Sequence, residues 1–533
     1  MQKLVFNFPP CSYIMCMVIS MWACSPKDED TNQLQQETAV IDTAYQQPYR
    51  LVYHFSPKVN WMNDPNGLVY YEDEYHLYYQ YNPKGTQWGN MSWGHAVSKD
   101  LVHWEELPVA IEMDEDSPMI FSGSAVVDHN SSGLCEGDSC IVAIYTAHLP
   151  GLQNQDIAVS NDKGRTFRKY EGNPVIDLGV SDFRDPKVFW YKEEKKWVMA
   201  VAMPLDKKVR FYGSENLIDW KFISDFGPEG DTTGIWECPD LFELPVENRN
   251  ASKWVMVVSF NDEEGEGSDM QYFIGDFDGT SFTNDNPPDR VLTLDDGLDF
   301  YAAVTWNNVP DERRVGIGWF NNWKYAEEIP TSVWRGAQSL VREFKLREFP
   351  EGIRLVQQPV EEQQQLRTAH QHFENINVGE QSSTNNVIVS GSTLEIIAEF
   401  AYETDSVTGL SEVTEFGLFV FKGEGQETAI GFDIASQSMF LDRTNSGNVS
   451  FHEAFPVKAA TLMPTENNRV KMHIFVDKSS VEVFGNNGYK TMSFRIFPDE
   501  SKDQVELYAL GGEVILLSLD VWKLRSIWDH PQM

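Results

Sequence analysis

The chain is organised around the stretch Trp61-Met62-Asn63-Asp64-Pro65-Asn66-Gly67, which runs directly into a strand-like segment, Leu68-Val69-Tyr70-Tyr71. The sequence Asp-Pro-Asn-Gly is ordinary turn chemistry, because proline presets φ and Asn-Gly tolerates positive φ. Taken alone, the stretch predicts a turn and no function. Its importance comes from two later carboxylates, Asp185 and Glu237, which occupy the matching position in a repeated pattern.

The repeat includes a segment with a polar residue, a small turn and a large closing aromatic. This segment recurs at four places, and the closing aromatics are 63, 53 and 62 residues apart. A period of about 60 residues suits a four-stranded propeller blade with long loops. The four segments are Ser98–Trp104, Ser160–Phe167, Ser214–Trp220 and Asp276–Phe282.

A second kind of segment lies 35 to 46 residues before each closing aromatic and leads into an apolar run. With a fifth candidate further along, these segments predict five blades over residues 50–350. The first strand of each blade lines the central channel of a propeller, so Asp64, Asp185 and Glu237 are expected to converge at one mouth of that channel. The alternative is a set of unrelated turn residues. The five segments are Asn63–Pro65, Phe121–Gly123, Arg184–Pro186, Glu237–Asp240 and Asp299–Ala302.

Two of these segments place neighbouring polar residues on what should be one strand. Neighbours in a regular strand point to opposite faces. Asn63 and Asp64 can therefore both face the channel only if the strand is bulged or turning there, and the same holds for Arg184 and Asp185. The proline that follows each aspartate favours irregular backbone.

The pattern of apolar and polar residues changes beyond Val360. A polar hinge, 361–365, is followed by clean alternation of apolar and polar residues, and Asn486-Asn487-Gly488 is typical of a hairpin turn. We therefore predict an all-β chain, with a five-bladed β-propeller over 48–355 and a C-terminal β-sandwich over 361–533. The sequence leaves open whether the sandwich buttresses the propeller, binds sugar or binds another subunit.

Composition excludes some partners. The chain has 533 residues, with 81 acidic and 42 basic side chains and a formal net charge of −39. Nucleic acid and anionic membrane surfaces both require clustered Lys and Arg, so neither is an expected partner. The chain shows no phosphate-binding loop and no ligand spacing typical of zinc, so no cofactor and no required metal are predicted. His95 and His103 are interpreted as structural.

The N-terminus is predicted to be a targeting segment. Residues 1–24 resemble a bacterial lipoprotein signal peptide that ends at Cys24, the expected lipidated residue, and residues 25–47 look like a flexible linker. The acidic run Lys27–Asp30 fits export to the cell surface, and a periplasmic location remains the alternative. Cys135 and Cys140 bracket a short loop that an oxidising compartment could close, and Cys238 is single.

Together the segments resemble glycoside hydrolase family 32, the β-fructosidases, from about Tyr53 to Ile496. No single segment is specific, but the combination is. The resemblance implies a five-bladed propeller followed by a β-sandwich, in agreement with the periodicity. The segments that carry it are Trp61–Gly67, Phe121–Ser124, Phe183–Pro186, Trp236–Asp240, Gly318–Trp319, Trp334–Arg335 and Phe475–Phe484.

The resemblance also implies roles for individual residues. Asp64 is the expected nucleophile, which attacks the anomeric carbon of a β-fructofuranosyl unit, Glu237 the acid/base, and Asp185 the residue that holds sugar hydroxyls and stabilises the transition state. Two carboxylates about 5–5.5 Å apart give a covalent intermediate and retention of configuration. Arg184 is expected to favour the ionised form of Asp185. Positions around the first sugar match Asn63, Gln80, Trp88, Phe121, Ser122 and Arg184, and Trp319 and Trp334 match aromatics on the rim.

The activity that this resemblance implies is release of terminal fructose from levan, inulin, fructo-oligosaccharides or sucrose. The exo assignment depends on the stretch Asn321–Ala326 and on Pro330–Gly336, which look most like exo-inulinases and levanases. Two alternatives belong to the same family, an endo-levanase and a transfructosylating enzyme. A third is a fructan-binding surface protein without catalysis.

Overall fold

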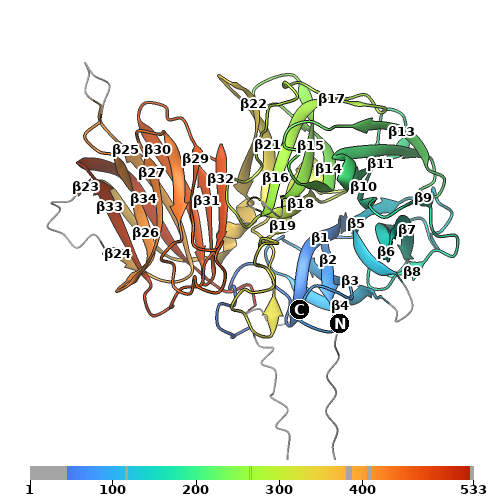
Figure 1. The fold of residues 1–533 in the computed structure, drawn as a ribbon, viewed down its shortest axis with the longest axis horizontal. Helices are drawn as coiled ribbons and strands as arrows, with labels where there is room; N and C mark the ends of the chain where they lie inside the picture. The colour runs from blue at the N-terminus through green and yellow to red at the C-terminus, as the bar shows by residue number, and fades with distance from the viewer. Residues whose placement is uncertain are drawn as a thin grey trace, which may run out of the picture. The chain divides into compact units, whose positions relative to one another are not determined.

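The computed structural model describes residues 45–113, 118–262, 265, 267–379, 387–404 and 411–528. The described part is nearly all β-structure, as predicted (Figure 1). Its helical elements are three short 3-10 turns, η1 (Pro204–Asp206), η2 (Pro310–Glu312) and η3 (Glu361–Leu366). The expected signal peptide, Cys24 and most of the expected linker lie outside the described residues.

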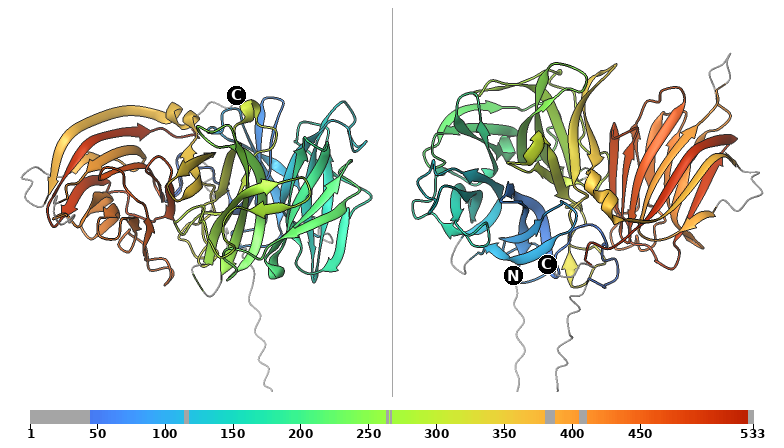
Figure 2. Two further views of the ribbon diagram at one scale, coloured as in Figure 1. Left: turned by 90° about the horizontal axis from the view of Figure 1, so that it is seen from above. Right: turned by 180° about the vertical axis from the view of Figure 1, so that it is seen from behind.

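Five antiparallel sheets follow one another along the first part of the chain and form the blades of a propeller (Figure 2). Blade 1 contains β1 (Asn60–Tyr71), β2 (Glu74–Asn82), β3 (Ser92–Ser98) and β4 (Glu105–Ile111), and blade 2 contains β5 (Met119–Asp128), β6 (Cys140–Leu149), β7 (Leu152–Ser160) and β8 (Arg168–Lys169), with β9 (Ile176–Val180) paired to β7. Blade 3 contains β10 (Arg184–Tyr191), β11 (Lys196–Met203), β12 (Lys208–Ser214) and β13 (Lys221–Phe226). Blade 4 contains β14 (Ile235–Pro245), β15 (Ser252–Asp262), β16 (Gly267–Phe277) and β17 (Phe282–Asn284), and blade 5 contains β18 (Tyr301–Thr305), β19 (Val315–Trp319), β21 (Arg342–Phe349) and β22 (Gly352–Pro359).

The ring closes between blades 5 and 1. The short strand β20 (Trp334–Arg335) leaves blade 5 and pairs in parallel with β1, where Asn60 faces Trp334 and Trp61 faces Arg335. The innermost strands β1, β5, β10, β14 and β18 contact one another in chain order, and β18 returns to β1. The channel predicted from the five inner segments is therefore lined by the five first strands.

The aromatic repeat marks the outer strands. Trp104, Phe167 and Trp220 each directly precede the fourth strand of a blade, and Phe282 begins the fourth strand of the next. The preceding turn supplies the polar cap: in blade 1 the Asp100 carboxylate accepts the backbone N–H groups of Val102 and His103. The aromatic then packs inward, which fixes where the outer strand begins.

The C-terminal part is a sandwich of two six-stranded sheets, as predicted. The hairpin predicted at Asn486–Gly488 joins two neighbouring strands, and Asn486 and Asn487 both have positive φ. One sheet has the order β23 (Arg367–Gly379), β34 (Glu513–Leu524), β25 (Leu394–Ala401), β30 (Arg469–Asp477), β31 (Ser480–Gly485), β32 (Lys490–Arg495), and the other has the order β24 (Val387–Ser390), β33 (Gln504–Leu510), β26 (Glu415–Gly423), β27 (Gln426–Asp433), β28 (Ser438–Asp442), β29 (Lys458–Leu462).

The two domains are joined by buried ion pairs. Arg342 of β21 donates to Asp295 at 2.8 Å and to Glu482 of β31 at 2.6 Å, and all three side chains are fully buried or nearly so. His54 lies 2.9 Å from both Asp477 and Glu482. Buried charges require such partners, and breaking one pair leaves another charge unpaired. The propeller itself continues to the end of β22 at Pro359 rather than to residue 355.

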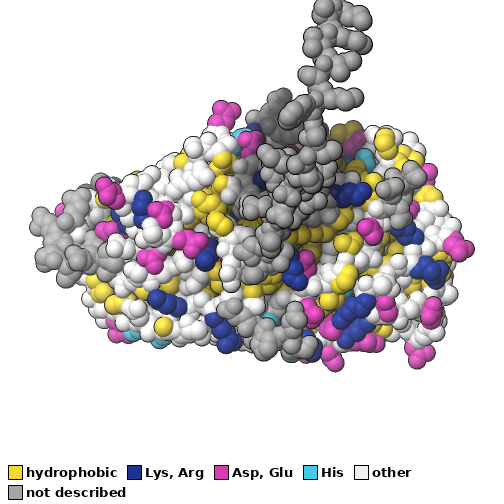
Figure 3. Space-filling view, turned by 90° about the horizontal axis from the view of Figure 1, so that it is seen from below, with side chains coloured by type: hydrophobic (Ala, Val, Ile, Leu, Met, Phe, Trp, Pro, Cys, Tyr) yellow, Lys and Arg dark blue, Asp and Glu magenta, His cyan; other side chains and the backbone are white. Residues whose placement is uncertain are grey.

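The surface charges bear on the expected partners, and the cysteines bear on the expected compartment. On the face seen in Figure 3, Lys and Arg side chains are interspersed with Asp and Glu, unlike the basic surface that nucleic acid requires. Cys135 and Cys140 form a disulfide, and Cys238 is free and buried. Among the described residues, no helix is long and apolar enough to cross a bilayer.

Candidate active site

Every innermost strand carries at least one bulge, and the bulges place the polar side chains in the channel. The pairing register shifts between Met62 and Pro65 in β1, between Arg184 and Lys187 in β10, and across Glu237–Asp240 in β14. The same shift occurs in β5 and β18. A bulge adds a residue on one strand and breaks strict alternation. The irregular backbone predicted for Asn63-Asp64 and Arg184-Asp185 is therefore confirmed.

Left-handed backbone accompanies three of these bulges, at Asp185, Cys238 and Ala302. Asp185 has φ of 65° and Cys238 has φ of 46°, values that residues other than glycine adopt only when the surroundings impose them. Both residues lie in the channel wall, at the positions that turn the strand. The site therefore contains local strain, which the fold of the propeller maintains.

Asp64 lies buried among hydrogen-bond donors. The Ser122 hydroxyl donates to Oδ2 at 2.6 Å and the Asn63 amide donates to Oδ1 at 3.1 Å. The Trp61 indole donates to the Asn63 side-chain oxygen at 2.8 Å, which keeps the amide nitrogen directed at Asp64. Burial raises the pKa of Asp64 to about 6, with a contribution from Glu237, while the hydrogen bonds from Ser122 and Asn63 act in the opposite direction. Asp64 is thus mostly ionised at neutral pH, and the hydrogen bonds from Ser122 and Asn63 hold its carboxylate in one orientation.

Glu237 is held from two sides. The Arg184 guanidinium donates Nε–H to Oε1 at 2.9 Å, and the Tyr301 hydroxyl donates to Oε2 at 2.5 Å. Glu237 keeps 18% of its side chain exposed, against 6% for Asp185. Of these two carboxylates, Glu237 is therefore the one that solvent or a leaving group can reach more readily.

Asp185 is buried at the same bulge. Its Oδ2 accepts the Cys238 backbone N–H at 3.0 Å, and its own backbone N–H donates to the Thr146 hydroxyl at 3.0 Å. Burial raises the pKa of Asp185 to about 7, and the nearby Glu237 and Asp64 add to this rise. Arg184 lowers the pKa, as expected, but burial outweighs it. The prediction that Arg184 favours the ionised form of Asp185 is therefore confirmed in direction, but burial has the larger effect on the pKa.

The three carboxylates surround one peptide unit. Cys238, the neighbour of Glu237, donates its backbone N–H to Asp185, and its sulfur lies 3.6 Å from Asp64 Oδ2. Burial and the two neighbouring carboxylates raise the pKa of Asp185 to about 7, so Asp185 still carries a proton in part of the molecules at neutral pH. The convergence predicted from the repeat is present in the structure.

The channel is closed beneath this cluster. Lys187 is buried and donates to Asp240 Oδ2 at 3.1 Å and to the Thr305 backbone oxygen at 2.5 Å. The cavity that remains among Ser122, Asp185 and Thr305 has a volume of about 10 Å³, room for about one water molecule. A sugar can therefore approach the carboxylates only from the open mouth.

An aromatic wall borders the mouth. Trp88 is 40% exposed and meets the Phe121 ring edge-on at 5.9 Å, and Phe121 stacks on His148 at 4.4 Å. The Trp88 backbone N–H donates to Glu327 Oε1 at 3.0 Å, which ties this loop to the loop between β19 and β20 of blade 5. Gln80 is buried behind the wall, where its amide donates to the Ile120 backbone oxygen at 3.0 Å. Trp88 and Phe121 thus place aromatic surface beside the carboxylates' mouth of the channel.

Trp319 and Trp334 do not lie on the rim, so that expectation is wrong. Both side chains are fully buried. Trp334 lies under the Arg50 guanidinium, which is 4.3 Å from its ring, and Trp319 packs against Trp61 and Trp323. Neither ring has an exposed face to offer a sugar in this structure.

Two residues that hold the carboxylates were not assigned from the sequence. Tyr301 belongs to the fifth inner segment, and its place at the β18 bulge, which matches that of Glu237 at the β14 bulge, was the available signal. Thr146 comes from β6, the second strand of its blade, and nothing in the repeat distinguishes it. Sequence periodicity identifies residues on the innermost strands, but it does not identify residues on the second strands, such as Thr146, that hold them in place.

The pH dependence of activity tests the surroundings of Asp64. Removing the Ser122 hydroxyl in Ser122→Ala takes away a charge-assisted hydrogen bond of about 1.5–3 kcal/mol, so the pKa of Asp64 rises further. With Asp64 as the expected nucleophile, which must be ionised, the acid limb of kcat/KM, expected near pH 6, should move about one unit or more to higher pH. Ser124→Ala, which removes a hydroxyl bonded to the Pro186 oxygen instead, should leave the limb in place. An unshifted limb in Ser122→Ala would contradict the assignment.

Comparison with known proteins agrees with this geometry. The family model described as "Glycosyl hydrolases family 32 N-terminal domain" matches residues 54–359, and "Glycosyl hydrolases family 32 C terminal" matches residues 362–523. The chain belongs to glycosyl hydrolase family 32. It is therefore a glycoside hydrolase of the β-fructosidase group, and the all-β propeller-plus-sandwich fold is that of the family's solved structures.

Three relatives illustrate the match. A levanase from Bacillus subtilis (strain 168) is 52% identical over 502 residues, which cover 92% of this chain and 72% of the relative. The exo-inulinase crystal structure from Aspergillus awamori has a TM-score of 0.84 at 39% identity, covering 91% of this chain and 100% of that chain. The fructofuranosidase from Schwanniomyces occidentalis complexed with fructose has a TM-score of 0.82 at 35% identity, covering 91% and 100%.

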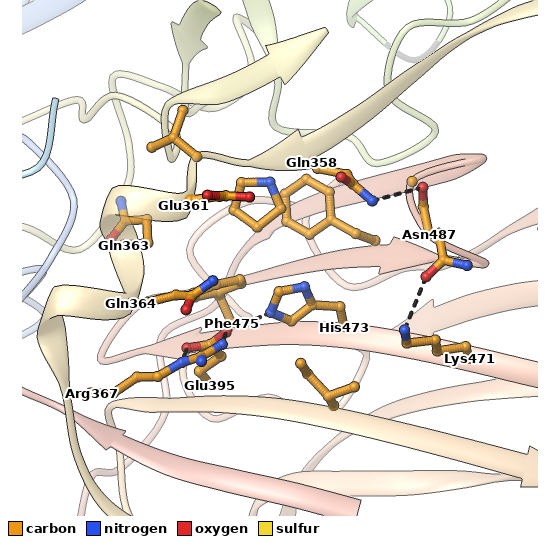
Figure 4. A pocket seen from close by; sticks show the side chains of 15 residues that line it. Gln358, Glu361, Gln363, Gln364, Arg367, Glu395, Lys471, His473, Phe475 and Asn487 are labelled. Carbon is orange, nitrogen blue, oxygen red and sulfur yellow. Dashed lines mark hydrogen bonds and ion pairs between the residues drawn. The ribbon is translucent and has the colours of Figure 1, made fainter. Parts of the chain in front are cut away.

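A separate cavity of about 190 Å³ lies where the end of blade 5 and η3 meet the sandwich (Figure 4). Its carboxylates are Glu361 and Glu395. Arg367 donates to Glu395 Oε1 at 2.6 Å and His473 Nε2 lies 2.7 Å from the same oxygen. Because Glu395 is engaged in this way, the cavity lacks the free pair of carboxylates that glycoside hydrolysis requires.

Proposed function

We propose that this family 32 enzyme is a retaining, exo-acting fructosidase that removes terminal fructose from fructans and sucrose. The observation that carries the proposal is the pairing of Asp64, buried and aimed by Ser122 and Asn63, with the more exposed Glu237 across the Cys238 peptide. Asp64 is arranged to attack the anomeric carbon. Glu237 is arranged to give a proton to the leaving group and to take one from the entering water. Two carboxylates with these distinct environments are the requirement of the retaining mechanism.

The proposed reaction has two displacements. In the first, an Asp64 oxygen forms a bond to the anomeric carbon of the fructofuranosyl unit while the bond to the leaving oxygen breaks, and Glu237 gives that oxygen its proton. In the second, Glu237 takes a proton from water, the water oxygen bonds to the anomeric carbon, and the bond to Asp64 breaks. Arg184 and Tyr301 hold Glu237 through both steps, since each donates to one of its oxygens.

The remaining residues are proposed to position the sugar. Asp185, at the deepest part of the mouth, would accept hydrogen bonds from hydroxyl groups of the fructosyl unit. Trp88 and Phe121 offer apolar surface to the face of the ring. Asn63, Ser122 and Arg184 act on the sugar as well as on the carboxylates, and Gln80 acts from behind the wall.

Two features support the exo assignment. The Lys187–Asp240 pair fills the channel below the carboxylates, so a sugar chain would not pass through the channel. One side of the mouth is walled by Trp88, which is tied to Glu327 across the ring closure. A site that is filled below and walled on one side accommodates a chain end better than an internal segment. The family relatives include an enzyme named extracellular exo-inulinase, of which the alignment covers 96%.

A timed product profile on levan, inulin and sucrose tests this proposal. Free fructose alone from the earliest time point is the expected result, and the faster polymer identifies the preferred linkage. A ladder of oligosaccharides at early times would replace the exo assignment with an endo mechanism. Products longer than the substrate would indicate transfer to sugar, and binding without any product would indicate a fructan-binding protein.

Export from the cytoplasm is proposed on two grounds. The Cys135–Cys140 disulfide suits an oxidising compartment. The Aspergillus relative is named extracellular. Lipidation at Cys24 remains a prediction from the sequence, because that residue lies outside the described part of the chain.

A further inference from the structure

The outer face of strand β23 carries histidines in an unusual arrangement. His370, His372 and Glu374 alternate along the strand and so point to the same side. β23 is the edge strand of its sheet, and its single neighbour is β34. In the register of this pair, Trp522 lies opposite His370 and Asp520 lies opposite His372. Five side chains with metal-ligating or aromatic character therefore share one edge of the sandwich.

The side chains of His370, His372 and Asp520 are in direct contact. His370 Nε2 and His372 Nδ1 each lie 2.8 Å from the same oxygen, Asp520 Oδ1. These three ligand atoms all lie within 4.8 Å of one another. One imidazole nitrogen from each histidine and one carboxylate oxygen thus converge on a single point from two strands.

The rings are also fixed from behind. The far nitrogen of His372, Nε2, lies 2.9 Å from Glu374 Oε1, and the His370 ring stacks on Trp522 with centroids 4.7 Å apart and planes within 6°. In metal sites, a ligating histidine almost always donates its second ring N–H to a carboxylate or carbonyl, which fixes its tautomer and orientation. Glu374 occupies this place for His372.

We propose that His370 Nε2, His372 Nδ1 and Asp520 Oδ1 form a binding site for a divalent first-row transition-metal ion, with Zn²⁺ the best fit. Imidazole and carboxylate together suit Zn²⁺, whereas Ca²⁺ and Mg²⁺ require oxygen ligands. With metal–ligand distances of about 2.0–2.2 Å, ligands in a tetrahedral site lie about 3.4 Å apart. The histidine nitrogens need to retreat from Asp520 by only about 0.6 Å, since the present separations are 2.8 Å.

The surroundings permit this movement and an open fourth position. The side chains of His370 and His372 are 45% and 42% exposed, so water completes the coordination. The ion displaces the protons that now link the imidazoles to Asp520. The pKa of His372 is raised by its hydrogen bonds to Glu374 and Asp520, so protons compete with the metal and affinity falls as the pH is lowered.

A metal here would pin an edge strand to its neighbour. Edge strands are held on one side only, and a cross-strand ion replaces the hydrogen bonds from His370 and His372 to Asp520 with stronger metal–ligand bonds between β23 and β34. The site is on the sandwich and shares no residue with the carboxylates of the propeller. Turnover should therefore not depend on it, and the inference stands apart from the proposed function.

Calorimetric titration of the untagged, chelator-treated full chain with ZnCl₂ at pH 7.5 tests the proposal. One ion per chain is expected. His372→Gln and His370→Gln should each weaken binding by more than about tenfold, and Glu374→Gln, which leaves the ligands in place, by about tenfold. His103→Gln is the matched control, because His103 pairs with Asp100 at 2.8 Å in the propeller without a second histidine beside it. Its Zn²⁺ affinity should equal that of the wild type.

Two results would overturn the proposal. One is the absence of saturable Zn²⁺ binding by the wild type. The other is unchanged binding in the double variant H370Q/H372Q. Should the variants fail to fold, as judged by melting of the metal-free proteins, anomalous diffraction at the zinc edge from wild-type crystals decides the matter: a peak between His370, His372 and Asp520 supports the site, and none there rejects it.

Discussion

Asp64→Asn is expected to lower kcat on sucrose and on fructan by about 10⁴-fold or more, the scale seen when a catalytic nucleophile is removed. The amide keeps the shape of the carboxylate: its oxygen can still accept from Asn63, and its NH2 group can donate to the Ser122 hydroxyl in place of the bond that Ser122 now donates. It cannot form the bond to the anomeric carbon, so the covalent intermediate is lost for every leaving group. Initial rates on sucrose and on an aryl fructofuranoside measure the effect, and both should fall together. Asp64→Ala should behave in the same way.

Stability separates loss of chemistry from loss of fold in this variant. Burial raises the pKa of Asp64 from 3.8 to about 6, so the folded state binds more protons than the unfolded state between these values. Stability contributed by this group therefore falls as the pH rises from 4 to 6 and stays low above it. At about 1.4 kcal/mol per pKa unit, the ionised carboxylate costs up to about 3 kcal/mol at pH 8.

Asp64→Asn should accordingly raise the melting temperature at pH 8 and lose most of that gain at pH 4. Thermal melts at the two pH values provide the measurement. An inactive protein with a higher melting temperature at pH 8 can only have lost chemistry. Retained turnover would exclude Asp64 as the nucleophile, and a melting temperature several degrees lower at pH 8 would contradict the electrostatic cost assigned to its burial.

The sequence predicts the fold well because the repeat is carried by both edges of each blade. The aromatics before the outer strands and the polar segments of the inner strands are in step, so blade number and channel-lining positions follow from spacing alone. The bulges also follow, since two adjacent polar residues and a proline cannot all satisfy a regular strand. These are local constraints, and local constraints can be read from a single chain.

Contacts between distant segments could not be predicted in the same way. Trp334 matches a rim aromatic by sequence, but Arg50, almost three hundred residues earlier, covers its ring. Asp299 stands in the fifth inner segment, yet it pairs with Arg443 of the sandwich at 2.5 Å. Periodicity places a residue on a strand. It does not show which remote side chain will cover or neutralise it.

The electrostatics of Asp185 show the same limit. Its neighbour in sequence, Arg184, lowers its pKa, and from the sequence this is the visible effect. In the structure the Arg184 guanidinium bonds Glu237 at 2.9 Å and lies 4.0 Å from Asp185, while burial dominates the pKa of Asp185. Arg184, which is next to Asp185 in the sequence, therefore binds Glu237, because strands β10 and β14 come together at the channel.

Glu237→Gln is expected to separate substrates by their leaving groups. On sucrose and fructan the leaving oxygen must be protonated, so kcat should fall by about 10³–10⁴-fold, within the range for general acid catalysis. An aryl fructofuranoside with an acidic phenol needs little protonation, and the first displacement should then remain fast. The glutamine can still accept the Arg184 hydrogen bond, so binding of unhydrolysed fructan should change by less than about tenfold.

The second displacement distinguishes an acid/base from a residue that only binds. Without Glu237 no group deprotonates the attacking water, so the fructosyl-enzyme on Asp64 should accumulate with the aryl substrate and appear by mass spectrometry. Azide, which needs no base, should then restore turnover and yield fructosyl azide. Asp185→Asn is the matched control: because Asp185 is proposed to act on the sugar and not on the leaving group, its loss should be similar for sucrose and the aryl substrate, without rescue by azide. Equal losses on both substrates in Glu237→Gln would remove Glu237 from the acid/base role.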